Sequence, residues 1–226
     1  MHSQQIDHAD IDKLYLGLEG KVSPRTARHV HSVFNACLGT AVRKKKIALN
    51  PMEAVEKIPF AGDSDVGVAL DDQQLRTLVQ GFKGSVLFPI VGVAAFTGAR
   101  RNEILALRWF DLDAEKNTLR IERALEETDA HGIRFKGPKK DSHKRTITID
   151  DDLLAMLLSE REKHLRIVAG IGASATVDLS LIKLPKDALM FPNLLGAELS
   201  FTAPRRPREV TKAFVAKAKL LGFPIP

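Results

Sequence analysis

Arg100 is the residue of this sequence whose type and setting best suit chemistry on a phosphate. It lies between two apolar stretches, residues 86–96 and 104–107, which predict a buried helix and the inner face of a second helix, with Gly98 turning the backbone between them. An arginine held by packing at such a corner can bind two non-bridging oxygens of a phosphate diester and keeps its charge near neutral pH. The same spacing also fits an arginine whose only role is an ion pair with Glu103. The residues alone therefore do not decide between a phosphate-binding arginine and a structural one.

A basic segment further along the chain is the second candidate for contact with a phosphate. From Arg134 to Arg145, six lysines and arginines face one acidic residue. Alternating apolar residues predict half-buried strands at residues 133–135 and 146–149, and a Gly-Pro pair between them favours a turn. The tip of such a basic ribbon can enter a groove of DNA.

The spacing around Arg100 carries a resemblance to a known family. Thr-Gly-Ala-Arg at residues 97–100, Glu103, and Leu-Arg-Trp-Phe-Asp at residues 107–111 resemble the first conserved box of the tyrosine recombinases, the phage integrase family. The resemblance implies a site-specific recombinase that cleaves and rejoins DNA through a 3′-phosphotyrosine. It also implies that Arg100 is catalytic and contacts the scissile phosphate, and that neither a metal nor another cofactor is required.

The basic segment agrees with this resemblance. Residues 138–147 resemble the hairpin that carries the catalytic lysine of the family, and by register that lysine is Lys139. An ammonium group at this place would give a proton to the departing 5′ oxygen. Lys136 and Lys140 are the alternatives for the role, and an ordinary exposed turn lysine is the interpretation without function.

The remaining catalytic residues of the family are not found in their expected order. The second box, His-x-x-Arg, and the later nucleophilic tyrosine should follow the last predicted helix. The one literal match, residues 131–134, precedes Lys139, and the only tyrosine, Tyr15, lies near the N-terminus. We therefore expect no nucleophile in this chain, which resembles a recombinase cut off at both ends and should bind DNA without cleaving it.

Composition limits the classes of protein that the chain can represent. The 226 residues carry a net charge of +6, which favours a polyanionic partner. The single cysteine, Cys37, excludes an internal disulfide framework and a thiolate metal cluster, and its place in an apolar helical stripe predicts a packing residue. The sequence shows neither a signal peptide nor a membrane span, so we expect a cytoplasmic protein without a membrane partner.

The periodicity predicts a mostly α-helical protein with a small antiparallel β-sheet, an α+β fold. Ser23 caps a helix that ends at the basic run 43–46, a short helix follows at residues 52–58, and Asp71 with Gln74 forms a capping box. Two further helices are predicted, at residues 151–165 and at residues 210–221. The first should turn Leu153, Leu154, Leu157 and Leu158 inward, and Ser200 should cap the segment that leads into the second. Residues 118–122 predict another strand, and residues 168–186 a loop insertion.

The resemblance divides the chain into residues 1–59, part of a helical core-binding domain that contacts DNA, residues 60–68, a linker, and residues 69–226, a truncated catalytic domain. The partner is the double-stranded DNA of a recombination site; full-length relatives assemble as a tetramer on DNA, and this chain is expected to be monomeric. The predicted DNA-binding residues are Arg43, Lys44, Lys45, Lys46, Lys136, Lys140, Lys144, Arg145, Arg205 and Arg206.

The sequence is also compatible with two other functions. The chain can be a non-catalytic DNA-binding or dominant-negative module that occupies recombination sites. It can also be a basic helical protein whose charges only confer solubility, in which case it would not bind duplex DNA even at low salt.

Overall fold

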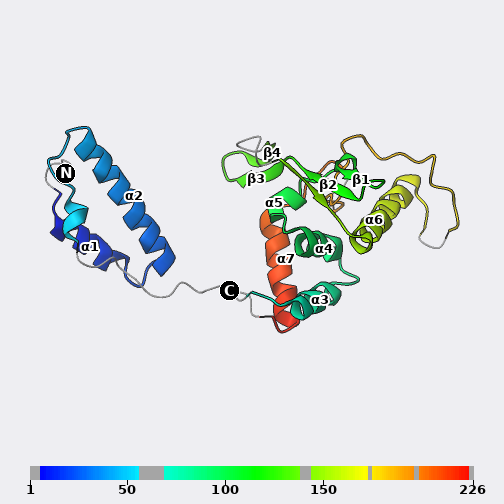
Figure 1. The fold of residues 1–226 in the computed structure, drawn as a ribbon, viewed down its shortest axis with the longest axis horizontal. Coiled ribbons are helices and arrows are strands. Elements are labelled where there is room, and N and C mark those ends of the chain that lie inside the picture. The colour runs from blue at the N-terminus through cyan, green and yellow to red at the C-terminus, as the bar shows by residue number, and fades with distance from the viewer. Residues whose placement is uncertain (1–5, 56–68, 138–143, 173–174, 196–198, 224–226) are drawn as a thin grey trace. The chain divides into compact units, whose positions relative to one another are not determined.

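The computed structural model shows two compact units, residues 1–68 and 69–225 (Figure 1). The structure describes residues 6–55, 69–137, 144–172, 175–195 and 199–223. The linker predicted at residues 60–68 lies outside the described residues. No helix within the described ranges is long and apolar enough to cross a membrane.

The N-terminal unit is small and helical, and it has a separate apolar core. Helix α1 (His8–Leu18) and helix α2 (Pro24–Arg43) are followed by the 3₁₀ turn η2 (Pro51–Ala54). Ser23 caps α2 as predicted, since its Oγ accepts a hydrogen bond from the N–H of Thr26 at 3.2 Å. The core of this unit consists of Ile11, Tyr15, Leu38 and Met52.

Two predictions for this unit were wrong. Cys37 is exposed, because the buried face of α2 is narrow and turns toward the neighbouring Leu38 instead. The helix predicted at residues 52–58 is only the 3₁₀ turn η2; Val55 is already extended, and residues 56–58 lie outside the described part.

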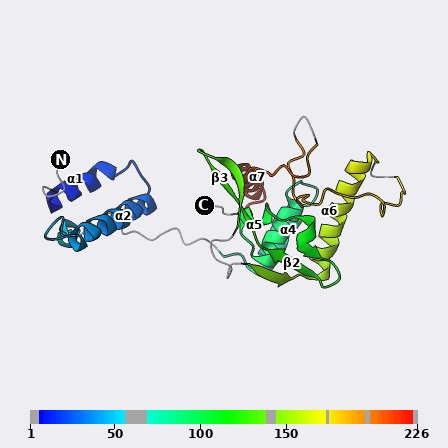
Figure 2. The ribbon, with the colours of Figure 1, turned by 90° about the horizontal axis from the view of Figure 1, so that it is seen from above.

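The helices of the second unit surround one apolar core. They are α3 (Asp72–Gly81), α4 (Phe88–Thr97), the single turn α5 (Arg101–Ile104), α6 (Asp151–Ala169) and α7 (Pro207–Leu220). The predicted capping box is present, because Asp71 accepts from the N–H of Gln74 at 2.7 Å and Gln74 accepts from the N–H of Asp71 at 3.0 Å. Helix α4 lies beside α6 in both views (Figure 1, Figure 2).

Some features of these helices differ from the predictions made from residue spacing. The second helix after Gly98 is only the turn α5, although Ile104, Leu105 and Leu107 are buried as predicted. Leu158 was predicted to face inward but is 38% exposed. Ser200 caps the turn that leads into the last helix, because its Oγ accepts a hydrogen bond from the N–H of Thr202 at 3.4 Å, and α7 itself begins later, at Pro207, with Arg206 as its N-cap.

The strands form two antiparallel sheets. Strands β1 (Leu112–Asp113), β2 (Thr118–Ile121) and β5 (Arg145–Thr148) form one sheet in the order β1-β2-β5, and β3 (Ala124–Thr128) pairs with β4 (Gly132–Lys136) in the other. The predicted ribbon was wrong in its pairing. Strand β4 pairs with β3 and strand β5 pairs with β2, so the two strands that flank the basic segment are not partners; residues 138–143 between them lie outside the described residues.

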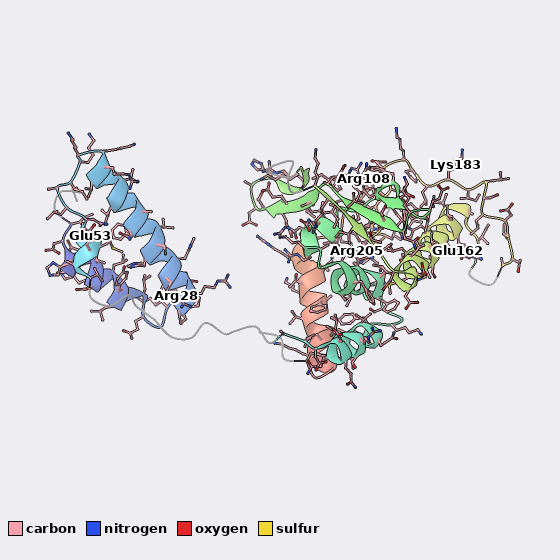
Figure 3. The ribbon with its side chains drawn as sticks, viewed as in Figure 1. Arg28, Glu53, Arg108, Glu162, Lys183 and Arg205 are labelled. Atoms are coloured by element: carbon pink, nitrogen blue, oxygen red, sulfur yellow. The ribbon has the colours of Figure 1, made fainter. Side chains whose placement is uncertain are left out.

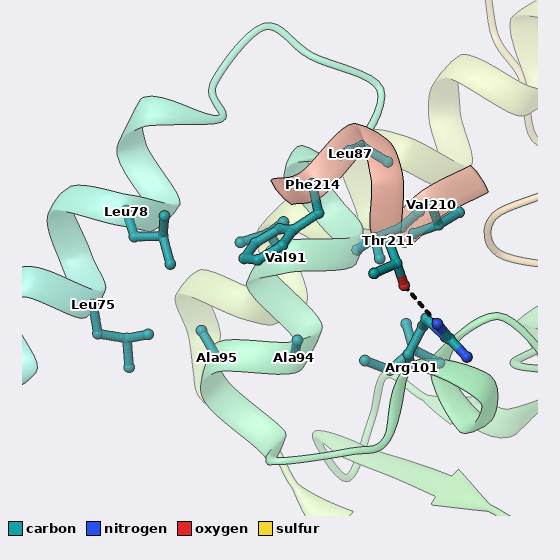
Figure 4. A pocket seen from close by; sticks show the side chains of 12 residues that line it. Leu75, Leu78, Leu87, Val91, Ala94, Ala95, Arg101, Val210, Thr211 and Phe214 are labelled. Atoms are coloured by element: carbon teal, nitrogen blue, oxygen red, sulfur yellow. Dashed lines mark hydrogen bonds between the residues drawn. The ribbon is translucent and has the colours of Figure 1, made fainter. Parts of the chain in front are cut away.

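An apolar cavity of about 350 Å³ lies where α3, α4, α5 and α7 meet (Figure 4). Leu78, Val91 and Phe214 line it, and at one side Arg101 donates a hydrogen bond to the Thr211 hydroxyl at 2.5 Å. This contact ties α7 to the turn that follows Arg100, so the last described helix supports the segment that carries the candidate arginine.

His164 on α6 is a buried histidine whose ring is held by aromatic neighbours. Its Nδ1 accepts a hydrogen bond from Trp109 Nε1 at 3.3 Å, and its ring meets those of Trp109 and Phe201 edge-on. Burial lowers the pKa of His164 from 6.5 to about 4. The folded protein therefore keeps this ring neutral at pH values where the unfolded chain protonates it.

This depressed pKa predicts that acid destabilises the second unit. The contribution of His164 is fully present above pH 6.5 and is lost as the pH falls toward 4. We expect the free energy of unfolding to fall by about 2 kcal/mol between pH 7.5 and 5. In His164→Gln, which keeps an acceptor for Trp109, urea titrations should show little of this loss; an equal loss in the variant would assign the pH dependence to other groups.

Candidate phosphate-binding site

The chain turns sharply between α4 and α5, and this corner presents Arg100. Gly98 ends α4 in the left-handed region with φ of 61°, which a residue with a side chain rarely adopts. The Thr97 hydroxyl then accepts a hydrogen bond from the N–H of Ala99 at 3.2 Å. Arg100 follows in an extended conformation as the N-cap of α5. The local sequence therefore fixes the direction in which the Arg100 side chain leaves the backbone.

The guanidinium group of Arg100 faces solvent. Its side chain is 79% exposed, so the expectation that packing on both sides holds it was wrong. Its contact is with Glu103, whose Oε1 accepts from Nη1 at 3.2 Å and whose Oε2 accepts from the backbone N–H of Arg100 at 2.9 Å. The ion pair considered as the alternative interpretation is thus present, and it leaves most of the guanidinium open to a ligand.

Glu103 also binds a second arginine from a distant strand. Arg145 of β5 donates to Glu103 through Nη2 at 2.7 Å and Nη1 at 3.2 Å, a bidentate contact. The hydrogen bonds from Arg145 lower the pKa of Glu103 from 4.5 to about 2, and the same contact raises the pKa of Arg145. One nearly buried carboxylate therefore orients two guanidinium groups.

A hollow of about 350 Å³ opens beside this pair. Arg100 and Glu103 form one part of its lining, and residues of β3 together with Lys136 form another. Lys136, a predicted DNA-binding residue, pairs with Glu126 at 2.7 Å, and Arg134 pairs with the same carboxylate. The predicted catalytic Lys139 and its neighbour Lys140 lie outside the described residues.

The other predicted DNA-binding cations fall into different surroundings. In the N-terminal unit α2 ends at Arg43, which donates to the Thr40 hydroxyl at 2.8 Å, and residues 44–46 follow in a turn. Arg205 is partly buried near Glu160, and burial lowers its pKa. Arg205 belongs to the second unit (Figure 3), and the next residue, Arg206, is exposed at the start of α7. Lys144 is exposed just before β5.

The tyrosine and the His-x-x-Arg match lie in places without catalytic geometry. Tyr15 is 6% exposed in the core of the N-terminal unit, and its hydroxyl is hydrogen-bonded to His31 at 2.5 Å. His131 lies in the turn between β3 and β4, while Arg134 on β4 pairs with Glu126. Among the described residues, no group of three or more acidic, histidine or cysteine side chains is arranged to hold a metal ion.

Sequence reasoning missed a cluster next to the hollow. Asp111, with its side chain 1% exposed, accepts from the backbone N–H of Arg108 at 2.9 Å and pairs with Arg123 at 2.6 Å and Arg120 at 3.8 Å. Burial raises the pKa of Asp111 even though both arginines oppose that shift. The alternation of β2 marks Arg120 as an outward-facing residue, because it lies between the inward-facing Leu119 and Ile121. Arg123 lies beyond the end of β2, so the alternation of the strand does not predict the direction of its side chain.

Two sequence relatives can be compared with the chain. It is 28% identical over 166 residues to a tyrosine recombinase XerC-like protein of Caldanaerobacter subterraneus subsp. tengcongensis, covering 68% of this chain and 41% of that protein. It is 32% identical over 124 residues to an integrase of Saccharopolyspora erythraea, covering 54% of this chain and 28% of that protein. The chain thus spans less than half the length of either relative. No family model matches the sequence.

Solved structures resemble the chain over nearly its whole length. The Tn1549 transposon integrase in complex with a circular intermediate DNA has a TM-score of 0.73 at 16% identity, covering 97% of this chain and 66% of that one. A lambda integrase tetramer bound to a Holliday junction has a TM-score of 0.60 at 16% identity, covering 98% of this chain and 55% of that one. The predicted fold class, mostly helical with small antiparallel sheets, is confirmed.

Proposed function

We propose that this chain belongs to the tyrosine recombinase family and binds the duplex DNA of a recombination site without cleaving it. The observation that carries the proposal is the corner at Arg100, whose exposed guanidinium is tethered through Glu103 to Arg145. Support comes from the resemblance of residues 97–111 to the first recombinase box and from the fold shared with integrases that are bound to DNA in their solved structures.

In this proposal Arg100 binds the phosphate that would be the scissile one in an active member of the family. Its donors meet the non-bridging oxygens, where negative charge increases during phosphoryl transfer, and a donor fixed in advance stabilises that charge without reorganisation. Arg145 acts through Glu103, because its bidentate contact holds the carboxylate that orients Arg100. Lys139 is proposed as the group that would protonate the leaving 5′ oxygen in an active member of the family.

The proposed lack of cleavage is supported by the position of Tyr15, the one tyrosine among these 226 residues. Tyr15 is buried and hydrogen-bonded in the N-terminal unit, so its hydroxyl is not offered to a phosphate. The basic run 43–46 is proposed to contact the DNA backbone from a core-binding domain, and residues 69–226 to form part of a catalytic domain. We propose that this chain acts as a monomer in the cytoplasm, without the tetrameric assembly seen for lambda integrase.

Salt-dependent binding to duplex DNA tests the proposal. If about five phosphates are neutralised, raising NaCl from about 50 to 200 mM should weaken binding roughly 100- to 1000-fold, because each contact releases a condensed counterion. Fluorescence anisotropy with a labelled duplex measures the slope. A lack of binding at about 50 mM NaCl would favour the basic helical protein without a DNA partner.

A nicked suicide duplex tests the absence of cleavage separately. Such a duplex traps a covalent protein–DNA adduct when a tyrosine attacks, and denaturing electrophoresis resolves the adduct. We expect none with this chain. An adduct that disappears in Tyr15→Phe would show that the buried tyrosine reaches DNA and would overturn the proposed lack of cleavage.

A further inference from the structure

A second hollow, of about 490 Å³, adjoins the one at Arg100. The two share Glu122, Arg123, Lys136 and Gly137 in their linings, so they lie next to each other on the second unit. Arg108, Phe135 and Lys144 complete the lining of the second hollow. Its four cationic side chains face one carboxylate, which favours an anion.

Arg108 is held in this hollow by aromatic rings. Its guanidinium carbon lies 5.1 Å from the ring centre of Phe135 and 5.7 Å from that of Phe110. These contacts are attractive and orient the planar group without neutralising its charge. Both rings are themselves partly exposed, at 38% and 44%, so the stacked group sits near the surface (Figure 3).

The carboxylates around the hollow are engaged by other cations. Asp111 binds the backbone N–H of Arg108 but directs its ion pairs to Arg123 and Arg120, and Glu122 also pairs with those two arginines. Within the described residues, no carboxylate pairs with Arg108, and its buried Nε lacks a hydrogen-bond partner. The Arg108 guanidinium therefore lines the hollow with a positive charge that no paired carboxylate of the described residues offsets, which favours an anion there.

We infer that Arg108 binds a phosphodiester of the DNA backbone, distinct from the phosphate assigned to Arg100. This inference rests on the proposed function, since the ligand is the same duplex. The guanidinium held near the two rings supplies several donors, and the residues shared by the two hollows place Arg108 beside the surface that carries Arg100, so one strand can contact both. Arg108 therefore sets the register of the duplex on the protein rather than taking part in phosphoryl transfer.

The test compares Arg108→Gln with a matched change, Arg161→Gln, on the exposed face of α6. Both variants lose one positive charge from the second unit. The full 226-residue chain is titrated with a labelled duplex at several NaCl concentrations, and folding is checked by Trp109 fluorescence and circular dichroism. We expect Arg108→Gln to weaken binding roughly 5- to 20-fold and to reduce the slope of log K against log salt by about 0.9. Arg161→Gln should change neither quantity by a comparable amount.

The outcomes separate this inference from the proposed function. If the unaltered chain binds and Arg108→Gln keeps the same affinity and salt slope, the inference is overturned while the proposed function stands. If the unaltered chain does not bind duplex DNA, the proposed function fails and the inference with it. If Arg108→Gln does not fold, Arg108→Lys decides: it keeps the charge but loses the planar fork, so the slope should stay while the affinity falls several-fold. An unchanged affinity in Arg108→Lys would contradict a fixed phosphate contact.

Discussion

Replacing Glu103 with glutamine is expected to lower the free energy of unfolding of the second unit by about 2–3 kcal/mol at pH 7. The carboxylate binds two arginines and has a pKa near 2, against 4.5 for an ordinary glutamate. Because the pKa in the folded protein is depressed, the stabilisation is fully present above pH 4.5 and is lost as the pH falls toward 2. Glutamine keeps an oxygen for the N–H of Arg100 but no charge for Arg145.

Urea titrations of wild type and Glu103→Gln at pH 7, 5 and 3 measure this effect. The stability difference between the two proteins should be nearly constant from pH 7 to 5 and should shrink markedly at pH 3. Glu115→Gln, the same change at an exposed glutamate, serves as the matched control and should cost little at any of these pH values. A stability difference that does not depend on pH would contradict the assigned role of the Glu103 charge.

The corner at Arg100 was predictable because its determinants are local. Gly98 is required by a positive φ, and Glu103 lies within hydrogen-bonding reach of Arg100 three residues earlier. The capping box at Asp71 and the N-cap at Ser23 follow from the same short-range logic. Features of this kind need only neighbours within a turn of the chain, and spacing records them directly.

Local spacing did not predict the solvent exposure of Arg100 or the contact between Glu103 and Arg145. Arg145, the strongest partner of Glu103, reaches it because β5 pairs with β2 in a register that sets Arg145 opposite Ile121. Alternation shows that a strand has an inner and an outer face, but not which strand lies next to it. For the same reason β4 and β5 were expected to form one hairpin, whereas they belong to different sheets.

Strand β3 was missed because its sequence carries almost no alternation. Of its five residues only Leu125 is buried, and the strand is defined by its pairing with β4. Helical spacing also predicted that Cys37 and Leu158 are buried, but both are exposed, because they lie at the margins of apolar stripes. The width of a buried face depends on what packs against it, and that is settled by tertiary contacts rather than by the helix itself.

The largest stability loss is expected from Phe82→Ala, far from the candidate site. Phe82 is fully buried at the end of α3, and its ring stacks on Phe214 of α7 with centres 5.3 Å apart. Removing the ring loses its burial and leaves a cavity, a change that typically costs about 3–5 kcal/mol. Phe96→Ala is the matched control, because Phe96 on α4 is 45% exposed and should cost less than about 1 kcal/mol.

Denaturant unfolding followed separately by Trp109 fluorescence and by circular dichroism measures the effect of Phe82→Ala. The two units have separate cores, so Trp109 should report an earlier transition while part of the helical signal, from α1 and α2, unfolds as in wild type. A single transition shifted equally for both probes would show that the units unfold together. Below that transition the variant keeps Arg100, Glu103 and Arg108 in place, so the salt slope of DNA binding should be unchanged. That result would separate the stability of the unit from the charges proposed to bind DNA.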